Sequence, residues 1–285
     1  MPDTYTPVQN YATKYHSKIA ERFKKQSITN SAAGNEYSFV GAKTIVVQSV
    51  DVVPLSDFSR TAAANRFGAV KNLGDTKQEM TCTQDKAFAF AIDAGDQSDE
   101  AIDKSAAQAL KRQIDEVITP TIDKYRLAAW ATNAGITTKS GSTTALTKDT
   151  ILPAIIKLGG DMSNELVPEE GRTLFIPIKN YQLLVQANAV VEIHGGMAEK
   201  AVERGVVGII NNNKVVPVPD SWFPTGVEFM VKYKGCTVDP VKLQNYYIRR
   251  DAQGFDGPVV EGRVYFDSFV LDAKAKGVAV YKLGT

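Results

Sequence analysis

One apolar stripe, which begins at Ile102 and runs to about Ala131, constrains the fold of this chain more than any other feature. Asp99 and Glu100 place negative charge where a helix would begin, and Gly135 follows its end. A helix of this length is a rod of roughly 50 Å, which is long for a compact domain of this size. The stripe recurs at the spacing of one helix face and consists of Ile102, Ala106, Leu110, Ile114, Val117, Ile118, Ile122 and Tyr125.

Pro120 lies inside that helix. A proline lacks the backbone N–H and crowds the carbonyl four residues before it, so we expect a bend near Glu116. Oppositely charged residues one turn apart, such as Arg112 and Glu116, favour a side that is solvated or faces another subunit.

Two strands precede the helix, and a long connection separates them. Residues 39–53 are rich in β-branched side chains, and residues 76–92 alternate between apolar and polar. The connection at 54–75 is polar, small and punctuated by glycine, and it is too long for a tight turn. We therefore expect it to leave the body of the subunit as a loop that a partner must hold.

The N-terminal region carries a second amphipathic pattern. A short helix of this kind is marginal alone, because nucleation is costly and its apolar stripe needs a surface to lie against. It must therefore dock, either on its own subunit or on a neighbour. The apolar side chains at helical spacing are Val8, Tyr11, Tyr15, Ile19 and Phe23.

A second domain is expected after the Ser/Thr/Gly-rich connector at 136–147. Residues 206–218 are typical of a hairpin with its turn at Asn211 to Asn213. The elements before it alternate between helix and strand, which predicts an α/β layer. They are a helix over 149–162, a strand over 172–178, and helices over 181–187 and 198–205.

From Val227 onward the sequence is typical of strands almost throughout. These late strands need a sheet to join, and the strands near Val40 and Phe90 are the expected partners. The first domain is then discontinuous, built from both ends of the chain with the α/β unit inserted between them.

Composition excludes several functional classes. The 33 lysines and arginines balance 32 aspartates and glutamates, so the net charge of +1 gives no bulk attraction to nucleic acid or to an anionic membrane. Cys82 and Cys236 are too few for a disulfide scaffold and too far apart in sequence for a zinc or redox motif. A polar N-terminus and the lack of an apolar run of about 18 residues argue against a signal peptide and a membrane span.

The sequence also lacks the common catalytic motifs, from the nucleophile elbow to the phosphate-binding loop. His16 lies in the N-terminal region, and His194 has Glu192 as its only acidic neighbour in sequence, so neither predicts a metal or acid–base site. Glu169 and Glu170 are explained as an exposed turn. We therefore expect no catalytic residue, no cofactor, no metal site and no enzymatic activity.

Seven segments resemble the major capsid proteins of tailed phages and prophages of Gram-positive bacteria. They span nearly the whole chain and are FKKQSITN (23–30), EYSFVGAKT (36–44), SVDVVPLSDFSR (49–60), LGDTKQEMTCTQDKAFAFAID (73–93), LKRQIDEVITPTIDKYRLA (110–128), GRTLFIP (171–177) and VEGRVYFDSFVLDAKAKGV (260–278).

This resemblance implies an α+β chain with the Hong Kong 97-like phage capsid fold. In that fold an N-terminal arm, an extended β-hairpin loop and a long spine helix accompany a peripheral domain and an inserted axial domain. The implied boundaries are an arm at 1–35, a peripheral strand at 36–49, the extended loop at 50–91, the peripheral domain at 92–146 with its spine helix at 98–134, the axial domain at 147–227 and C-terminal peripheral strands at 228–285.

The function implied by the resemblance is that of a major capsid protein. Copies would self-assemble into hexamers and pentamers of an icosahedral or prolate shell around the double-stranded DNA of the phage. The protein would be made in the bacterial host cytoplasm and reside in the virion, with packaged DNA in non-specific contact and no membrane. The candidate contacts between subunits are Tyr11, Tyr15, Ile19, Phe23, Arg60, Arg66, Phe67, Lys71 and Lys77.

Further partners and alternatives accompany this interpretation. Some relatives carry a scaffolding segment before the arm, whereas the amphipathic arm of this chain begins near Val8, so a separate scaffolding protein is expected. A portal and decoration proteins are the other implied partners. An encapsulin-like nanocompartment shell would have the same architecture but enclose an enzyme. An α/β enzyme would use Glu169, Glu170 or His194, and a phage tail-tube protein is the remaining structural alternative.

Overall fold

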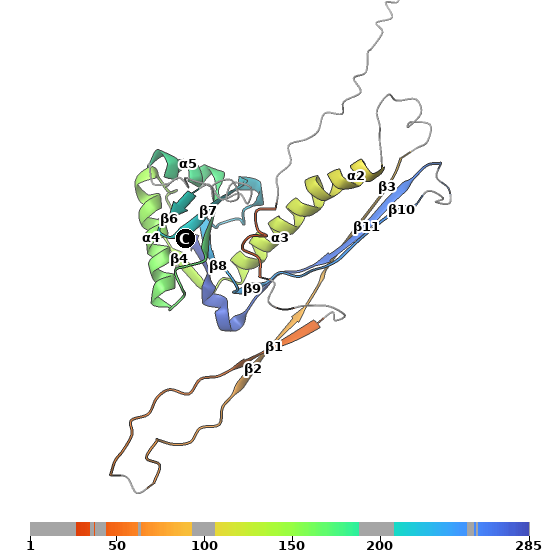
Figure 1. Ribbon diagram of the computed structural model, residues 1–285. Coiled ribbons are helices and arrows are strands. Elements are labelled where there is room, and N and C mark those ends of the chain that lie inside the picture. Colours follow the sequence, from red (N-terminus) through yellow and green to blue (C-terminus); the bar gives the residue numbers. More distant parts are fainter. Residues whose placement is uncertain are drawn as a thin grey trace, which may run out of the picture.

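The computed structural model describes residues 27–34, 37, 44–61, 64–92, 106–187, 208–249, 254 and 256–284. Figure 1 shows three parts: a helix-covered sheet at one end, a long helix lying along a narrow sheet, and a hairpin that projects from the body. Helices and sheets therefore form separate layers of an α+β protein, as the sequence predicted.

Three helical segments form one continuous helix of 27 residues. They are α2 (Ala106–Gln113), the π-helical turn η1 (Ile114–Ile118) and α3 (Thr119–Thr132). The sequence predicted a bend near Glu116, and the structure has a π-helical turn there, where Pro120 has no N–H to give to the carbonyl of Glu116. The part of the predicted helix before Ala106 lies outside the described residues. None of the helices described here has the length and apolar character needed to cross a membrane.

The long helix lies along an antiparallel sheet in the order β10-β11-β3. Its strands are β3 (Gln84–Ala91), β10 (Val241–Arg249) and β11 (Val259–Phe266). Ile118 and Ile122 of the helix pack on β11 through Val264 and Phe266, so one face of this sheet is covered. The predicted pairing of a late strand with the strand near Phe90 is confirmed by β11 and β3.

A six-stranded mixed sheet forms the other end of the subunit, in the order β4-β13-β8-β5-β7-β6. Helices α4 (Lys148–Asn164) and α5 (Ile178–Gln186) cover one face through a cluster that includes Leu158 and Phe229. Helix α3 covers the other face, where Trp130 packs against Phe175. The strands are β4 (Ile136–Lys139), β5 (Arg172–Pro177), β6 (Gly208–Ile210), β7 (Asn213–Val218), β8 (Phe229–Tyr233) and β13 (Val278–Lys282).

Most local predictions for this unit are confirmed. The helices expected at 149–162 and 181–187 and the strand expected at 172–178 are α4, α5 and β5. The predicted hairpin is β6–β7, and its turn residues Asn211 and Asn212 have positive φ values of 45° and 63°. The helix expected over 198–205 lies outside the described residues.

Two late strands join this sheet, and not the strands near Val40 and Phe90 that were expected as partners of the late strands. Strand β8 pairs with β5, and β13 pairs with β8 and β4. Both strands are buried on their two faces, and such strands need a sheet that is covered on both sides. The remaining elements of this region are the paired strands β9 (Thr237–Val238) and β12 (Phe269–Val270) and the 3-10 helix η3 (Asp272–Gly277), while η2 (Asp220–Trp222) precedes β8.

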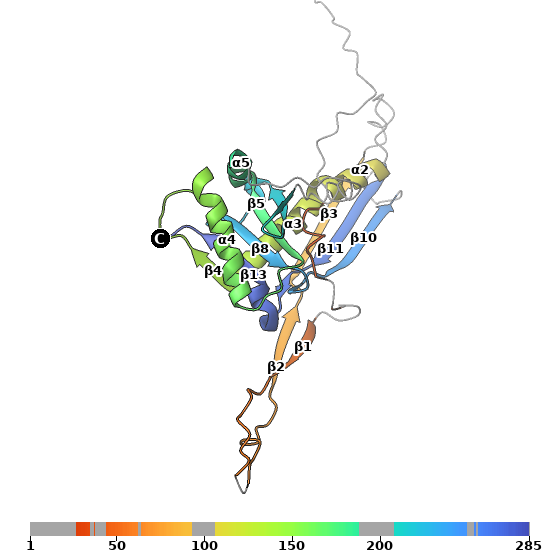
Figure 2. The same ribbon diagram turned by 60° about the vertical axis from the view of Figure 1, so that its left-hand side comes forward.

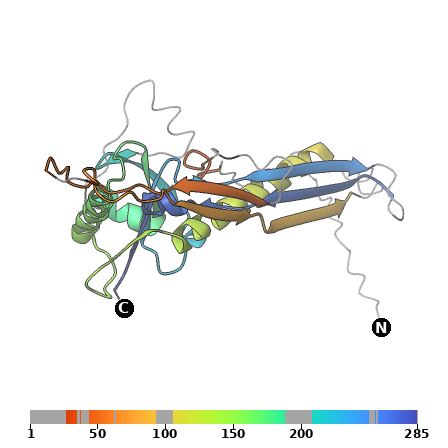
Figure 3. The same ribbon diagram turned by 90° about the horizontal axis from the view of Figure 1, so that it is seen from below.

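Strands β1 (Thr44–Val50) and β2 (Asp75–Thr81) form a two-stranded antiparallel hairpin. Residues 51–61 and 64–74 continue outward from it without regular structure, and Figure 2 shows hairpin and loop leaving the body as one projection. Seen from below in Figure 3, the hairpin and the three-stranded sheet lie end to end. Strand β3, which falls within the segment 50–91 expected as an extended loop, pairs with β11 in the three-stranded sheet.

Candidate assembly interface

The loop at 51–74 exposes an unusual amount of apolar surface. Five of its large apolar side chains are at least 64% exposed, and Leu55 reaches 102%. Several large exposed apolar side chains on one loop favour a surface that binds a partner, because soluble monomers rarely leave large apolar areas in water. The five side chains are Val52, Leu55, Phe67, Val70 and Leu73.

The loop is nevertheless held across its own width. Phe58 and Phe67 pack edge to face, and the N–H of Ser59 donates to the carbonyl of Arg66 at 3.0 Å. Gly68 has a φ of +85°, and a Cβ there would lie 2.7 Å from the side chain of Ser56. The two sides of the loop are thus linked at several points, while most of its large apolar side chains remain exposed.

The described members of the predicted contact set all lie in or beside this loop and are exposed. Arg60, Arg66, Phe67 and Lys71 are in the loop, and Lys77 is on β2, where its ammonium lies 3.7 Å from a carboxylate oxygen of Asp75. Their role in contacts between subunits stays a prediction. The arm residues of that set lie outside the described residues: Tyr11, Tyr15, Ile19 and Phe23.

Phe67 is the one apolar loop residue in the predicted contact set. Val52, Leu55 and Val70 are at least as exposed as Phe67 but were not predicted, because the connection was interpreted as polar. The available signal was the repeated apolar residue in VDVVPLSDF at 50–58, inside a segment with no strand or helix to bury it.

The base of the projection is fixed to the body by polar contacts. Asp267 accepts hydrogen bonds from the N–H of Thr83, at 2.7 Å, and from the hydroxyl of Tyr125, at 2.7 Å. Burial and the hydrogen bond to Asp267 raise the pKa of Tyr125 to about 12. Met80 and Cys82 complete the anchor in a small apolar cluster with Leu271. These contacts therefore fix the direction of the hairpin relative to the long helix.

The open face of the three-stranded sheet is a second candidate surface. Because side chains alternate across a strand, Arg263 points to the face opposite the long helix. There its Nε donates to Oδ1 of Asp85 at 2.8 Å. This hydrogen bond lowers the pKa of the Asp85 carboxyl. On the same face Arg249 lies 3.2 Å from Glu261, and Tyr247 between these pairs is 55% exposed.

A groove of about 410 Å³ crosses this face, and small side chains border it. Ala87 and Ala89 belong to β3, which lies at the edge of the sheet and has one row of backbone groups facing outward. Small side chains beside a free strand edge allow another chain to approach closely. The face thus offers polar pairs, one aromatic ring and a shallow apolar floor.

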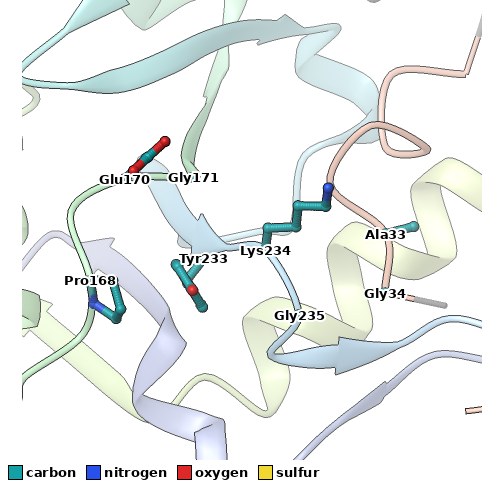
Figure 4. A pocket seen from close by; sticks show the side chains of 8 residues that line it. All are labelled: Ala33, Gly34, Pro168, Glu170, Gly171, Tyr233, Lys234 and Gly235. Atoms are coloured by element: carbon teal, nitrogen blue, oxygen red, sulfur yellow. The ribbon is translucent and has the colours of Figure 1, made fainter. Parts of the chain in front are cut away.

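A second hollow, of about 490 Å³, lies beside the end of β8, and Figure 4 shows its lining residues coming from three segments. Glu170 and Lys234 are its charged members, whereas the neighbouring Glu169 contacts the hydroxyl of Ser163 at 3.4 Å. The two glutamates are thus not a converging pair. The described part of the chain holds no cluster of three or more histidine, cysteine or acidic side chains that could bind a metal ion. His194 lies outside the described residues.

No protein-family model matches the sequence, and no curated protein is similar to it. The fold is similar to several solved structures at low sequence identity. A chain of the Mycobacterium phage Che8 structure is 15% identical, with a TM-score of 0.75 over 97% of this chain and 98% of that one. The capsid structure of cyanophage P-SCSP1u is 16% identical, with a TM-score of 0.74 over 97% and 94%. The mature capsid of bacteriophage PhiM1 is 10% identical, with a TM-score of 0.71 over 96% and 92%.

Proposed function

Since the chain has the Hong Kong 97-like fold over nearly its whole length, we propose that it is the major capsid protein of a tailed bacteriophage. Its copies form a homo-oligomeric shell, and the protein acts through assembly instead of catalysis. Its place is the virion, after synthesis in the cytoplasm of the bacterial host.

The observation that carries this proposal is the exposed apolar loop at 51–74. Burying a large apolar side chain contributes roughly 1.5–3 kcal/mol relative to leaving it in water, and the loop exposes five of them. The projection carries them away from the described body of the subunit, as Figure 2 shows. A neighbouring copy is the surface that covers them in a shell.

The geometry suits assembly through many modest contacts. The loop, the open face of the three-stranded sheet and the helix-covered end are separate surfaces of one subunit (Figure 1). In hexamers and pentamers with closed symmetry, every subunit makes the same contacts with its neighbours. The binding free energies of many weak contacts then add up to a stable shell. Each single contact stays weak enough to be corrected during assembly.

Charge is consistent with a container for DNA. The 33 basic and 32 acidic residues leave a net charge of +1, so the wall does not bind packaged DNA strongly and contact is non-specific. A separate scaffolding protein, a portal and decoration proteins are the further partners that we propose.

We assign the capsid regions as follows. The extended loop comprises the β1–β2 hairpin with residues 51–74, the spine helix includes α2 to α3, and the peripheral domain contains the sheet β10-β11-β3. The axial domain contains the six-stranded sheet, including β8 and β13. Residues 1–35 would form the N-terminal arm.

Expression of the full chain followed by sedimentation and negative-stain electron microscopy tests the proposal. We expect closed particles of uniform diameter built from hexameric and pentameric units, and nuclease-protected DNA when they are isolated from an infected or induced host. A protein that remains monomeric at every concentration, alone and in host extract, contradicts the proposal.

A further inference from the structure

Residues 27–34, with the sequence SITNSAAG, pack against α3, where Ile28 and Ala32 share a buried cluster with Leu127 and Trp130. Figure 1 shows them as a short coil next to that helix, and they form no strand. The N–H groups of Ala32 and Ala33 both donate to the carbonyl of Thr29, at 3.0 and 2.9 Å, which folds the segment into a compact turn. Ile28, Thr29 and Ala32 are at most 2% exposed. The segment is therefore enclosed like a bound peptide.

The first half of the segment is recognised by Asp123 of α3, which is fully buried. Its carboxylate accepts three hydrogen bonds: from the hydroxyl of Ser27 at 2.7 Å, from the N–H of Ile28 at 2.9 Å and from the hydroxyl of Thr29 at 2.6 Å. Within the described part of the chain, every donor to this carboxylate comes from residues 27–29.

Arg126 lies one helical turn further along α3 and binds the side chains of Thr29 and Asn30. Its Nη1 donates to the side-chain oxygens of Thr29, at 3.2 Å, and Asn30, at 2.7 Å. Its Nη2 donates to the carbonyl of Asp239 at 3.2 Å. The guanidinium therefore bridges the segment and the loop that follows β9.

The end of the segment is held by Asp239. The N–H of Gly34 donates to its carboxylate, and its own N–H donates to the carbonyl of Gly34, both at 2.9 Å. Trp130 and Ser268 donate to the other carboxylate oxygen. A Cβ on residue 34 would lie 1.7 Å from the carbonyl oxygen of Thr237, so only glycine fits at this position.

Lys232 contacts the segment from β8. Its ammonium is fully buried, donates to the carbonyl of Ala32 and lies 4.5 Å from the centre of the Trp130 ring. In the part of the chain that the structure describes, the Ala32 carbonyl is the hydrogen-bond acceptor of this ammonium. Burial lowers the pKa of Lys232, as expected for a cation removed from water.

We propose that Asp123, Arg126, Lys232 and Asp239 form a peptide-recognition site whose ligand is the chain's own segment 27–34. The site requires hydroxyls at positions 27 and 29, a small apolar residue at 32 and glycine at 34. Two buried cations balance two buried anions, and the peptide supplies the hydrogen bonds that their burial demands.

Binding of the segment at this site stabilises the folded core of the subunit. Without the segment, the carboxylate of Asp123 and the ammonium of Lys232 would lose the hydrogen-bond partners that residues 27–32 supply, which is unfavourable. Each folded subunit therefore holds the segment, and whatever precedes Ser27 starts from the same point beside α3. The inference does not depend on the proposed capsid function, because binding of the segment can be measured on the subunit alone.

The full-length Gly34→Val variant, whose own segment cannot dock, provides the test. A synthetic peptide of residues 27–34 with a fluorophore on an N-terminal linker is titrated with this variant and with the wild-type chain, and anisotropy is measured. We expect binding to Gly34→Val and at least about tenfold weaker binding to the wild type, whose site is filled by its own segment.

Two further peptides report on recognition. A Thr29→Val peptide loses its hydrogen bond to Asp123 and should bind Gly34→Val at least about tenfold more weakly, since a hydrogen bond to a charged group is lost. A Ser31→Ala peptide is the matched control, because Ser31 is exposed, and should bind like the wild-type peptide.

If Gly34→Val does not fold alone, the same peptide added during refolding should restore its circular dichroism spectrum and cooperative unfolding. A peptide that neither binds nor restores folding overturns the proposal. So does a Thr29→Val peptide that is as effective as the wild-type one.

Discussion

Phe58 and Phe67 pack edge to face across the projecting loop, with ring centroids 5.0 Å apart. An aromatic pair of this geometry contributes roughly 0.5–1.5 kcal/mol, so the tip keeps a defined shape although Phe67 remains 85% exposed. A loop that is already shaped loses less conformational freedom when it binds. The projecting loop is thus preorganised for binding a partner.

Replacing Leu55 and Val70 with aspartate should separate folding from assembly. These side chains are 102% and 95% exposed, so the free energy of unfolding in urea should change by at most about 0.5 kcal/mol. Shell formation should be lost, because a buried carboxylate without a partner is costly. Sedimentation velocity distinguishes shells from subunits.

The matched control for that double variant is Asn72→Asp. It adds a charge to the same loop without removing an apolar side chain, and it should still form shells. Shells formed equally well by Leu55→Asp/Val70→Asp would show that the apolar loop is not an assembly surface.

Gly262→Ala should destabilise the three-stranded sheet. A Cβ at this position would lie 2.2 Å from Cε1 of Phe88 and 2.8 Å from Cδ1 of Tyr246, because the two rings close over the glycine. Overpacking of this kind costs about 1–3 kcal/mol, measurable by urea unfolding. Combining the change with Phe88→Leu should recover part of the loss, and a fully stable Gly262→Ala chain would contradict the packing described.

Arg172→Met should loosen the turn that follows α4. The buried guanidinium of Arg172 donates to the carbonyls of Gly159, Val167 and Pro168 and to the hydroxyl of Ser163, at distances of 2.6–3.1 Å. We expect a loss of about 2–4 kcal/mol in the free energy of unfolding, because several acceptors lose a charged donor.

Lys157→Met is the control for Arg172→Met, since it removes an exposed cation from α4. It should change the free energy of unfolding by at most about 0.5 kcal/mol. Equal losses for the two variants would mean that Arg172 does not hold the turn.

Stability should fall as the pH rises from about 10 to about 12, in part through Tyr125. The folded chain raises the pKa of this hydroxyl from 10.0 to about 12, through burial first and the hydrogen bond to Asp267 second. Below a pH of about 10 the Tyr125 hydroxyl is protonated in both the folded and the unfolded chain, and its full contribution to stability is present. Between the two values only the unfolded state loses the proton, so rising pH favours unfolding.

Tyr125→Phe removes that titration. The variant should be less stable than the wild type at neutral pH, where the hydrogen bond is intact, and its stability should decline less steeply over the alkaline window. Urea unfolding at successive pH values measures both curves, with the difference at neutral pH as the reference. Parallel curves would contradict the linkage to Tyr125.

Features set by local pattern were predictable from the sequence. The apolar stripe located the long helix, and Pro120 located its π-helical turn, because the missing N–H acts within one turn. Asn211 and Asn212 located a hairpin turn, since asparagine tolerates positive φ. Each of these depends on residues close together in the chain.

Features set by distant partners were not predictable in this way. The apolar runs in β8 and β13 indicate strands buried on both faces but not which sheet they join. The strands near Val40 and Phe90 were the expected partners, whereas β8 pairs with β5 and β13, and β13 pairs with β4 and β8. The contact between Lys232 and Ala32 joins residues 200 positions apart, and no spacing rule pairs a lysine in an apolar strand with a carbonyl so far away.

The candidate surface was only partly predicted. The length and glycine content of 54–75 indicated an excursion, yet Phe67 was its only apolar residue predicted as a contact, and Leu55 and Val70 were not. Periodicity identifies apolar side chains that share a face of a regular element, and Leu55 and Val70 belong to no helix or strand.

A cryo-electron microscopy map of the particles formed by the full chain tests the central claim most directly. We predict closed shells in which residues 51–74 of each subunit lie against a neighbouring copy, with Leu55, Phe67 and Val70 buried there. A map in which this loop packs on its own subunit, or a preparation that contains only isolated subunits, would contradict the account.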